Sequence, residues 1–383
     1  MLFRSLRSAP TCLLLRTSFP RKPFDFAQGP ELVEGRESGR GSRGTPLVRG
    51  RAQENAGSGQ GAAGMTQSRK IAVVANPHAS SGRVRERWRE IGSALQSRLH
   101  TVTLLFTEKG GHGTELTRDL LRQGHDLIVA AGGDGTINEV ANGFVNADGT
   151  IFAGAAMGIL PLGTGGDFQR TLGIPSKLED AVEILASGIS APIDLGKAEF
   201  VGLNGAPATR YLVNVASFGM GGAVASRAKN PWSRWSGRLA FLWATFAVVA
   251  SYRGNRVTLE IDGAPSPNSY RITNIAIGNG RFHGSGMHPC PTAVLNDGIL
   301  EVTVIEYLHL FELARDIRIL YSANVYRHPK VHHLRGRRIV ARAEEPTLIE
   351  IDGEPLGALP LEVTIAPGRL LVVVPRSSPL LAP

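Results

Sequence analysis

The stretch IVAAGGDGTINE at residues 128–139 is the most informative part of this chain. Four apolar residues rich in strand formers run into a glycine-rich turn, and the turn opens into a helical pattern. Glycine lets the backbone adopt conformations closed to other residues and leaves the space above the turn free of side chains. The amides of such a turn and the positive end of the following helix together favour phosphate. The stretch therefore predicts a phosphate-binding turn, although two glycines alone would also fit a structural turn.

One residue of this turn, Asp134, narrows the kind of phosphate ligand. A carboxylate would repel a bare phosphate unless a metal ion or a hydroxyl group lies between them. Carboxylate and phosphate oxygens are the ligands that Mg²⁺ prefers. Asp134 therefore indicates a nucleotide that carries Mg²⁺.

Length and composition are those of a globular protein. The chain has 383 residues, 42% of them hydrophobic and 20% charged, which suits two domains with real cores. Its two cysteines, Cys12 and Cys290, exclude a disulfide framework and a cysteine-rich metal site. Of the net charge of +9, residues 1–64 contribute +5, with ten basic against five acidic residues, so the remainder carries only +4. The body of the chain is mildly basic, which argues against nucleic acid as a partner.

The first 68 residues are expected to form a disordered extension. Residues 1–64 are rich in Gly, Arg, Ser and Pro and show no sustained periodicity. The apolar run at 12–15 is too short for the core of a signal peptide, although the Arg-rich start is similar to an organelle transit peptide. Met65 is the alternative start, because the first strand pattern follows directly behind it. No apolar stretch reaches the roughly 18 to 20 residues that cross a bilayer.

Residues 69–192 alternate between strand and helix patterns. Strands are expected at 71–75, 101–107, 126–131 and 157–160, with helices at 83–98, 113–123, 136–145 and 178–187. This alternation predicts a parallel sheet covered by helices on both faces, a Rossmann-like three-layer domain. Ligands of such sheets bind at the carboxyl ends of the strands. Every glycine-rich loop of this region follows a strand, so we expect the nucleotide at that edge.

Residues 193–376 are expected to form a β-rich second domain, a β-sandwich. Turn signals such as Asp262-Gly263 and Asp352-Gly353 separate the strand patterns. Helical patterns interrupt them near 232–252 and 308–326. The sequence leaves open whether the last strands return to the first domain. The expected strands are 210–215, 257–261, 272–278, 300–305, 338–343, 347–351, 362–365 and 370–374.

Six blocks in this chain resemble the bacterial diacylglycerol-kinase-like lipid kinases, which are grouped with sphingosine and ceramide kinases. GGDGT alone would also fit NAD kinases and phosphofructokinases, but the six together, in family order, cover nearly everything from residue 70 onward. The resemblance implies an ATP-binding first domain of the NAD kinase and diacylglycerol kinase type, with the active site in a cleft between the domains. The blocks are ANPHASSG at 75–82, GGDGTINEVANG at 132–143, LPLGTGGDFQRTLGIP at 160–175, IAIGNGRFHGSGM at 275–287, NDGILEV at 296–302 and IDGEPL at 351–356.

The resemblance also implies which residues meet the nucleotide. The chain departs from the family pattern at one position: Gly166 stands where the family often has an asparagine, so an amide side chain is missing from that loop. Asp167 is then a candidate either for the Mg²⁺–phosphate network or for bracing the loop. The implied contacts are Asn76, Pro77, Ser80, Ser81, Gly82, Thr107, Gly132, Gly133, Asp134, Gly135, Thr136, Ile137, Asn138, Gly163, Thr164 and Asp167.

Two acidic turns of the second domain complete the implied site. Asp352 matches the family's general base for the lipid hydroxyl, with Glu354 as the alternative base or as an orienting group. By itself the Asp-Gly-Glu pattern would be an ordinary hairpin turn. In the NDGIL block, Asp297 with the carbonyl groups of Val294 and Ile299 matches a structural Mg²⁺ site, although Asn-Asp-Gly is also a good turn.

Two stretches of the second domain are candidates for contact with a lipid surface. The apolar residues 239–250 lie between Arg238 and Arg253 and fit either a lipid-facing wall or a buried core helix. The basic run at 327–338 fits either attraction of anionic headgroups or a solvated face.

We therefore expect an ATP- and Mg²⁺-dependent lipid kinase that converts diacylglycerol to phosphatidic acid. The enzyme is expected to be cytoplasmic and to meet its lipid substrate peripherally at the membrane surface, without nucleic acid. Homodimer formation is left open. A sphingoid base or NAD as acceptor, or a nucleotide-binding regulator without catalysis, are the alternatives.

Overall fold

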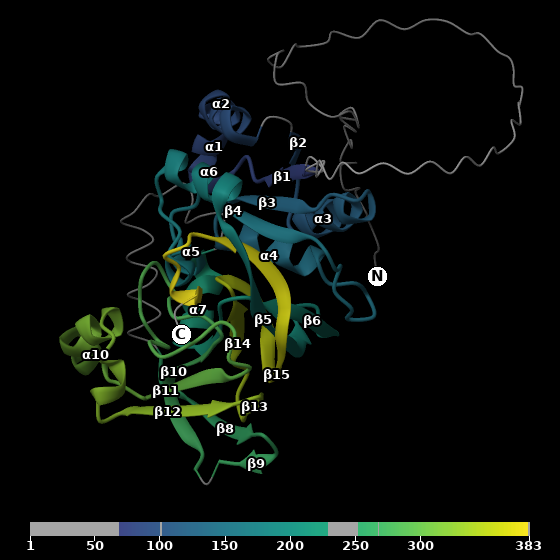
Figure 1. Cartoon of the computed structure of the whole chain (residues 1–383). Helices are drawn as coiled ribbons and strands as arrows, with labels where there is room; N and C mark the ends of the chain where they lie inside the picture. Colours follow the sequence, from purple (N-terminus) through teal and green to yellow (C-terminus); the bar gives the residue numbers. More distant parts are fainter. Residues whose placement is uncertain (1–68, 100–101, 229–251, 267, 382–383) are drawn as a thin grey trace, which may run out of the picture.

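The computed structural model describes residues 69–99, 102–228, 252–266 and 268–381. Within these ranges the chain forms two lobes, an α/β lobe followed by a β-rich lobe (Figure 1). The expected N-terminal extension and the apolar residues 239–250 lie outside the described residues.

A four-stranded parallel sheet forms the centre of the first lobe. Its order is β2-β1-β3-β4. Every residue of β1 and β3 is buried, which is typical of parallel strands covered on both faces. This confirms the alternating pattern read from the sequence. The strands are β1 (Ile71–Ala75), β2 (Val102–Phe106), β3 (Leu127–Gly132) and β4 (Ala156–Pro161).

Helices cover the two faces of this sheet. α2 packs against α6 on one face, and α3 packs against α4 on the other (Figure 1). The helix expected at 83–98 is divided into a short first turn and a longer second helix. The elements are η1 (Ala79–Gly82), α1 (Arg83–Glu86), α2 (Trp88–Leu99), α3 (His112–Arg122), α4 (Asp134–Gly143), α5 (Asp167–Leu172) and α6 (Leu178–Ser187).

The second lobe is sandwich-like, and its pairing forms a closed circuit. β10 pairs with β8, β8 with β13, β13 with β15, β15 with β14, β14 with β7, and β7 with β10. Closure leaves none of these six strands as a free edge and encloses a separate apolar core. The strands are β5 (Ile189–Gly202), β6 (Pro207–Leu212), β7 (Val215–Gly219), β8 (Asn255–Ile261), β9 (Ala264–Pro265), β10 (Tyr270–Gly278), β11 (Leu300–Glu306), β12 (Val331–Gly336), β13 (Arg338–Ala343), β14 (Leu348–Ile351) and β15 (Glu354–Val374).

Short helices complete the second lobe. The sequence pattern predicted one helix at 308–326. The structure has a short α-helix and two 3₁₀ helices there, and few of their residues are buried. The elements are α7 (Met220–Ala228), α10 (Leu310–Asp316), η2 (Ile317–Tyr321), η3 (Val325–Arg327) and the C-terminal η4 (Pro379–Leu381).

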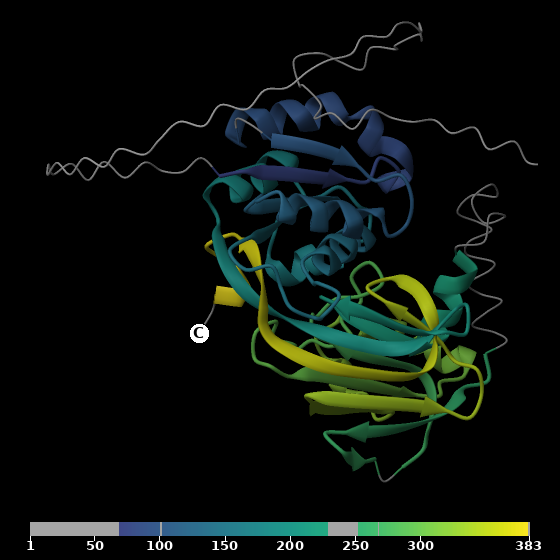
Figure 2. The same cartoon turned by 90° about the vertical axis from the view of Figure 1, so that its right-hand side faces the viewer.

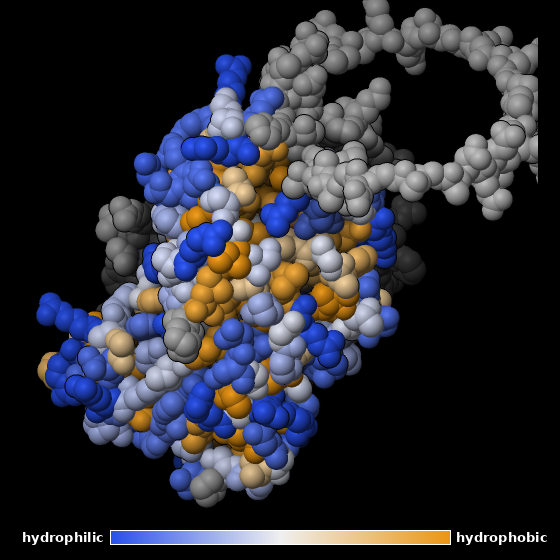
Figure 3. Space-filling view, in the orientation of Figure 1, coloured by the Kyte–Doolittle hydropathy of each residue, from blue (hydrophilic) through white to orange (hydrophobic). Residues whose placement is uncertain are grey.

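Two long strands join the lobes. β5 leaves the first lobe and β15 returns to it, and they pair with each other along most of their length (Figure 2). At its end β15 also pairs with β4, through Leu371 and Val372. The return that the sequence left open is therefore made by β15. In the space-filling view hydrophobic residues gather across the middle of the molecule, where these strands lie, and polar residues dominate the outer parts (Figure 3).

Candidate active site

Two glycine turns at the carboxyl ends of β3 and β4 lie against each other. A Cβ added to Gly163 would overlap the Cα of Gly133, and one added to Gly133 would lie 3.3 Å from the Cα of Gly163. A Cβ on Gly132 would overlap Thr136. The turns therefore meet backbone to backbone, which only glycine allows here. Thr164 beside them is exposed, so its hydroxyl is open to a ligand.

Asp134 faces the start of α5. Its carboxylate accepts hydrogen bonds from the backbone N–H groups of Phe168, at 3.2 Å, and Asp167, at 3.4 Å. Burial raises the pKa of Asp134, and these N–H groups oppose the rise. Asp134 thus acts as an acidic cap for α5 and fixes the second glycine turn. Its Mg²⁺-linked role stays a prediction.

The loop after β1 lies beside the same turns. Ser80 donates from its hydroxyl to the carbonyl oxygen of Leu162, at 2.6 Å. The side chain of Asn76 accepts the N–H of His78, at 2.9 Å, and shapes the turn that contains Pro77. Ser81 and Gly82 follow in η1. Thr107, at the end of β2, is buried, so its hydroxyl is less open than that of Thr164.

Asp352 is a buried bracing group. It is 3% exposed and lies at a φ of 48°, in the left-handed region. Its carboxylate accepts the N–H groups of Val213, Asn214 and Val215 at 2.9–3.0 Å, and the side-chain amide of Asn138 at 2.7 Å. Burial raises the pKa of Asp352, and the four donors oppose the rise. Four donors leave no open position on this carboxylate for a substrate proton.

Asn138 has the same bracing function from the first lobe. Its side chain is 1% exposed and also donates to the carbonyl oxygen of Tyr211, at 2.8 Å. The resemblance implied that Asn138 contacts the nucleotide, but the structure places its amide in the contact between the lobes. Asn138 lies one turn into α4, on the side that faces β6, and its contact with the nucleotide stays a prediction.

Glu354 brings a carboxylate to the glycine turn. A Cβ added to Gly135 would lie 2.9 Å from its Oε1, so Glu354 lies directly against the GGDGT turn. The side chain is half-buried. Asp352 and Glu354 flank one glycine and have different surroundings: the first is enclosed by donors, and the second faces the phosphate turn.

Two charged residues were not predicted as site residues from the sequence: Arg210, which lies near Glu354, and Glu139, which lies near Arg210. The Nε of Arg210 donates to the side-chain oxygen of Asn138, at 2.6 Å, and burial lowers the pKa of Arg210 despite the nearby carboxylates of Glu139, Asp352 and Glu354. Glu139 accepts the N–H groups of Gly111 and Gly113, at 2.7 and 2.8 Å, and so holds the start of α3. Glu139 lies inside the quoted motif, whereas a single arginine in a short strand carries no sequence signal.

Asp167 ties the second lobe to the glycine turns. It accepts the N–H groups of Ser285 and Gly286, both at 2.8 Å, and pairs with Arg170 at 2.7 Å. Of the two roles expected for Asp167, the structure therefore shows the contacts that brace the loop. Gly166, the departure from the family pattern, has a φ of 66°, which glycine adopts without strain.

The same loop carries a buried acid–base pair. The Nε2 of His283 lies 2.6 Å from Oε1 of Glu350, which also accepts the hydroxyl of Ser217 at 2.6 Å. Burial lowers the pKa of His283, but the carboxylates of Glu350, Asp167 and Asp352 together outweigh it and raise the pKa overall. Burial likewise raises the pKa of Glu350, and His283 lowers it overall. This pair holds the 281–287 loop against β7 and β14.

The structural Mg²⁺ site implied at Asp297 does not fit the side chains present. One oxygen of Asp297 accepts the N–H of Ile299, at 3.0 Å, and the other pairs with Arg335, at 3.1 Å. A guanidinium therefore takes the place that the cation would need. Val294 is 38% exposed beside it. In the part of the chain that the structure describes, no three His, Cys, Asp or Glu side chains are grouped to hold a metal ion.

Most of the basic run at 327–338 is neutralised by acidic neighbours. Arg338 pairs with Glu260 and Glu362, Lys330 with Glu312, and Arg335 with Asp297 and Glu301. The pairing favours the solvated face over the headgroup-attracting surface. The other lipid-contact candidate, 239–250, lies outside the described residues. Among the described helices, none is long and apolar enough to cross a membrane.

Comparison with known proteins agrees with this arrangement. Residues 70–198 match the model of the diacylglycerol kinase catalytic domain, and residues 214–374 match that of the YegS C-terminal NAD kinase beta sandwich-like domain. Among curated proteins, the chain is 29% identical over 323 residues to a "Probable lipid kinase YegS-like" protein of Pseudomonas fluorescens, covering 83% of this chain and 99% of that one.

Two further comparisons extend this match. The chain is 25% identical over 309 residues to a diacylglycerol kinase of Bacillus subtilis, covering 80% of this chain and 97% of the relative. A solved structure of a diacylglycerol kinase from Bacillus anthracis aligns with a TM-score of 0.59 at 20% identity, over 82% of this chain and 99% of that one. At that identity the structural match shows the shared two-domain fold.

Proposed function

This chain belongs to the family of diacylglycerol-kinase-like lipid kinases, and from that premise we propose that it transfers the γ-phosphoryl group of ATP to the hydroxyl of diacylglycerol. The observation that carries the proposal is the position of Glu354 against Gly135. A carboxylate from the second lobe meets the turn that would hold phosphate, which is what proton removal beside a transferring phosphoryl group requires.

In the proposed reaction Glu354 is the general base. Its carboxylate takes the proton of the lipid hydroxyl, and the oxygen forms a bond to the γ-phosphorus. The bond from that phosphorus to the bridging oxygen breaks, and ADP leaves with the electron pair. The products are ADP and phosphatidic acid. This assignment favours Glu354 over Asp352, because the four donors around Asp352 hold its carboxylate away from a substrate.

The other site residues bind and orient. In this proposal the amides of residues 132–136 and the hydroxyl of Thr164, which is exposed, would hold phosphate oxygens. When bound with ATP, Mg²⁺ would neutralise charge that develops on these oxygens. Asp134 is the carboxylate of the turn that would face this ion, and no step depends on the NDGIL turn. Arg210 supplies a buried positive charge beside Glu354.

The test is a substrate panel. Purified protein is incubated with labelled ATP, Mg²⁺ and diacylglycerol, a sphingoid base or NAD in mixed micelles. Label in phosphatidic acid, reduced when Mg²⁺ is chelated, is the expected result. Label in the sphingoid base or in NAD alone would reject diacylglycerol as the acceptor, and no label in any acceptor would favour a nucleotide-binding regulator.

A further inference from the structure

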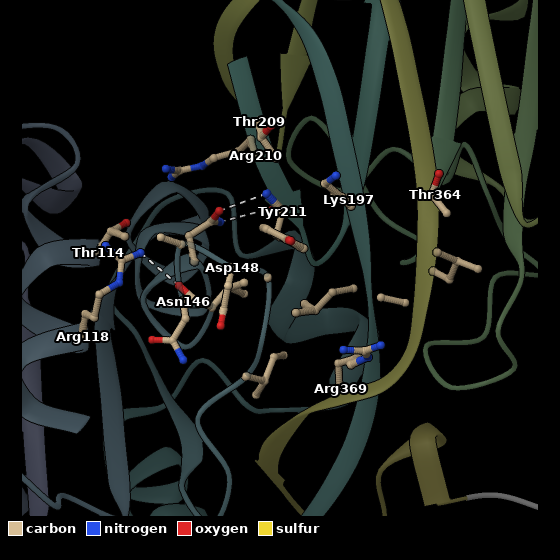
Figure 4. Close-up of a pocket in the computed structure, with 18 residues that line it drawn as sticks. Thr114, Arg118, Asn146, Asp148, Lys197, Thr209, Arg210, Tyr211, Thr364 and Arg369 are labelled. Carbon is tan, nitrogen blue, oxygen red and sulfur yellow. Dashed lines mark hydrogen bonds between the residues drawn. The ribbon is translucent and has the colours of Figure 1, made fainter. Parts of the chain in front are cut away.

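A cavity of about 640 Å³ lies between the lobes, apart from the glycine turns. It is bordered by α3, by the carboxyl end of α4 with the loop that follows it, and by β5, β6 and β15 (Figure 4). The GGDGT turn forms the opposite, amino end of α4. Not one of the residues implied in nucleotide binding lines the cavity. It is therefore a separate feature of the contact between the lobes.

The lining of this cavity is positively charged. Four cationic side chains border it, Arg118, Lys197, Arg210 and Arg369, against one carboxylate, Asp148. Figure 4 shows Arg118 on the first-lobe side and Lys197 and Arg369 on the opposite side, with Tyr211 between them. Like charges gathered around one space repel each other, and an anion placed among them removes that repulsion.

Two of the four charges, those of Arg118 and Arg369, have no carboxylate partner among the described residues. Lys197 pairs with Glu199 at 2.8 Å. Across residues 69–99, 102–228, 252–266 and 268–381, Arg118, Arg210 and Arg369 form no ion pair with a carboxylate. Asp148 is already engaged by the N–H and the hydroxyl of Thr150, at 2.9 and 2.7 Å. The charges of Arg118 and Arg369 are therefore available to a ligand, whereas the carboxylates of Glu139, Asp352 and Glu354 act on Arg210.

Arg118 carries a donor without an acceptor. Its Nη2 donates to the carbonyl oxygen of Val145, at 3.0 Å, which fixes the guanidinium at the cavity wall. Its Nε is buried and finds no acceptor among the described residues. A buried N–H without a partner is unfavourable, and such groups in native proteins commonly indicate a missing ligand or water.

We propose that this cavity is a binding site for a phosphomonoester anion, distinct from the site of phosphoryl transfer. Guanidinium groups present paired N–H donors that match phosphate oxygens. Hydroxyl groups of Thr209, Tyr211 and Thr364 line the same space and add neutral donors. The phosphate can belong to a lipid headgroup or to a soluble ester. The site goes beyond the proposed function, because neither Asp352, Glu354 nor any residue of the implied nucleotide set lines it. Arg210 borders both sites, since it lines the cavity and its charge also lies beside Glu354.

The experiment measures binding to the full-length chain by two probes. Glycerol 3-phosphate, a soluble phosphomonoester, is titrated by calorimetry, and vesicles of phosphatidylcholine with and without phosphatidic acid are used in flotation. Arg369→Gln is the main variant, because Arg369 is exposed and its loss disturbs little packing. This variant should raise the Kd for phosphate about tenfold, which corresponds to the loss of one charged hydrogen bond. Arg118→Lys keeps the positive charge but loses the paired N–H donors of the guanidinium, and it should raise the Kd similarly.

Two matched variants control for charge. Arg122→Gln removes an exposed charge one turn further along α3, and Arg376→Gln removes one just beyond β15. Neither lines the cavity, so both should bind like the parent. Binding of both probes supports a site open to either source, and binding of only one identifies that source.

Three results would overturn the proposal: no binding of either probe, equal loss in the control variants, or ATP affinity that falls together with phosphate affinity in Arg369→Gln. The last would make the cavity part of the nucleotide site. Because binding is measured without turnover, failure of the proposed kinase activity would leave this test intact.

Discussion

The turns at 132–136 and 352–354 meet each other across the two lobes, but the chain specifies them in different ways. The first is local: a buried strand, glycines and a helix follow one another, and the backbone itself forms the site. The role of the second turn depends on contacts between residues far apart in the chain, because residues 213–215 and Asn138 donate hydrogen bonds to the Asp352 carboxylate. A local motif can thus identify where phosphate binds, whereas the division of roles between two nearby carboxylates needs the tertiary structure.

The largest expected effect tests that division at Glu354. Glu354→Gln keeps the shape of the side chain and removes the proton acceptor, so we expect kcat to fall by about 10²- to 10⁴-fold. The melting temperature should stay near that of the parent. Steady-state kinetics with labelled ATP measure the change. Glu344→Gln, at an exposed position of the same lobe, is the control and should keep full activity. An active Glu354→Gln enzyme would remove Glu354 as the base.

Asp352 should respond in the opposite way. In Asp352→Asn an amide N–H₂ would face backbone N–H donors, leaving buried donors unsatisfied. We expect the free energy of unfolding to fall by about 3 kcal/mol, measured by chemical denaturation. Asp262→Asn is the matched control: Asp262 also precedes a glycine at positive φ and accepts two backbone N–H groups, but it is exposed. A fully stable Asp352→Asn protein without turnover would restore Asp352 as the base.

The same contrast explains what the sequence could and could not predict. The parallel sheet and its glycine turns followed from periodicity and from the need for phosphate-binding amides. The closed circuit of the second lobe did not, because pairing of β8 with β13, or of β15 with β4, joins residues far apart in the chain. The hydrogen bond between Asn138 and Asp352 could not be predicted for the same reason: the motif is local, and the partner is 214 residues away.

Gly135→Ala tests whether the two turns must touch. The added Cβ would lie 2.9 Å from Oε1 of Glu354 and should push that carboxylate out of line. Displacement of a reacting group by about 1 Å lowers the reaction rate by up to about 100-fold, so we expect kcat/KM to fall by about 10- to 100-fold. Gly110→Ala is the control, because a Cβ there meets nothing within 4 Å. Parent-like activity of Gly135→Ala would mean that Glu354 need not lie against this turn.

The smallest expected effect concerns the His283–Glu350 pair, which holds the 281–287 loop behind the second turn. The pKa of His283 is raised in the fold, so its contribution to stability is present below pH 6.5 and is lost as the pH rises through the raised value. The pKa of Glu350 is lowered, so its contribution is present above pH 4.5 and is lost as the pH falls through the lowered value. Besides Glu350, the carboxylates of Asp167 and Asp352 act on His283 in the same direction.

His283→Gln should therefore be less stable than the parent by about 1 kcal/mol between pH 4.5 and 6.5, with a smaller difference at higher pH. Thermal melts of both proteins across this range measure it, and a difference independent of pH would show that His283 acts through packing and not through its charge.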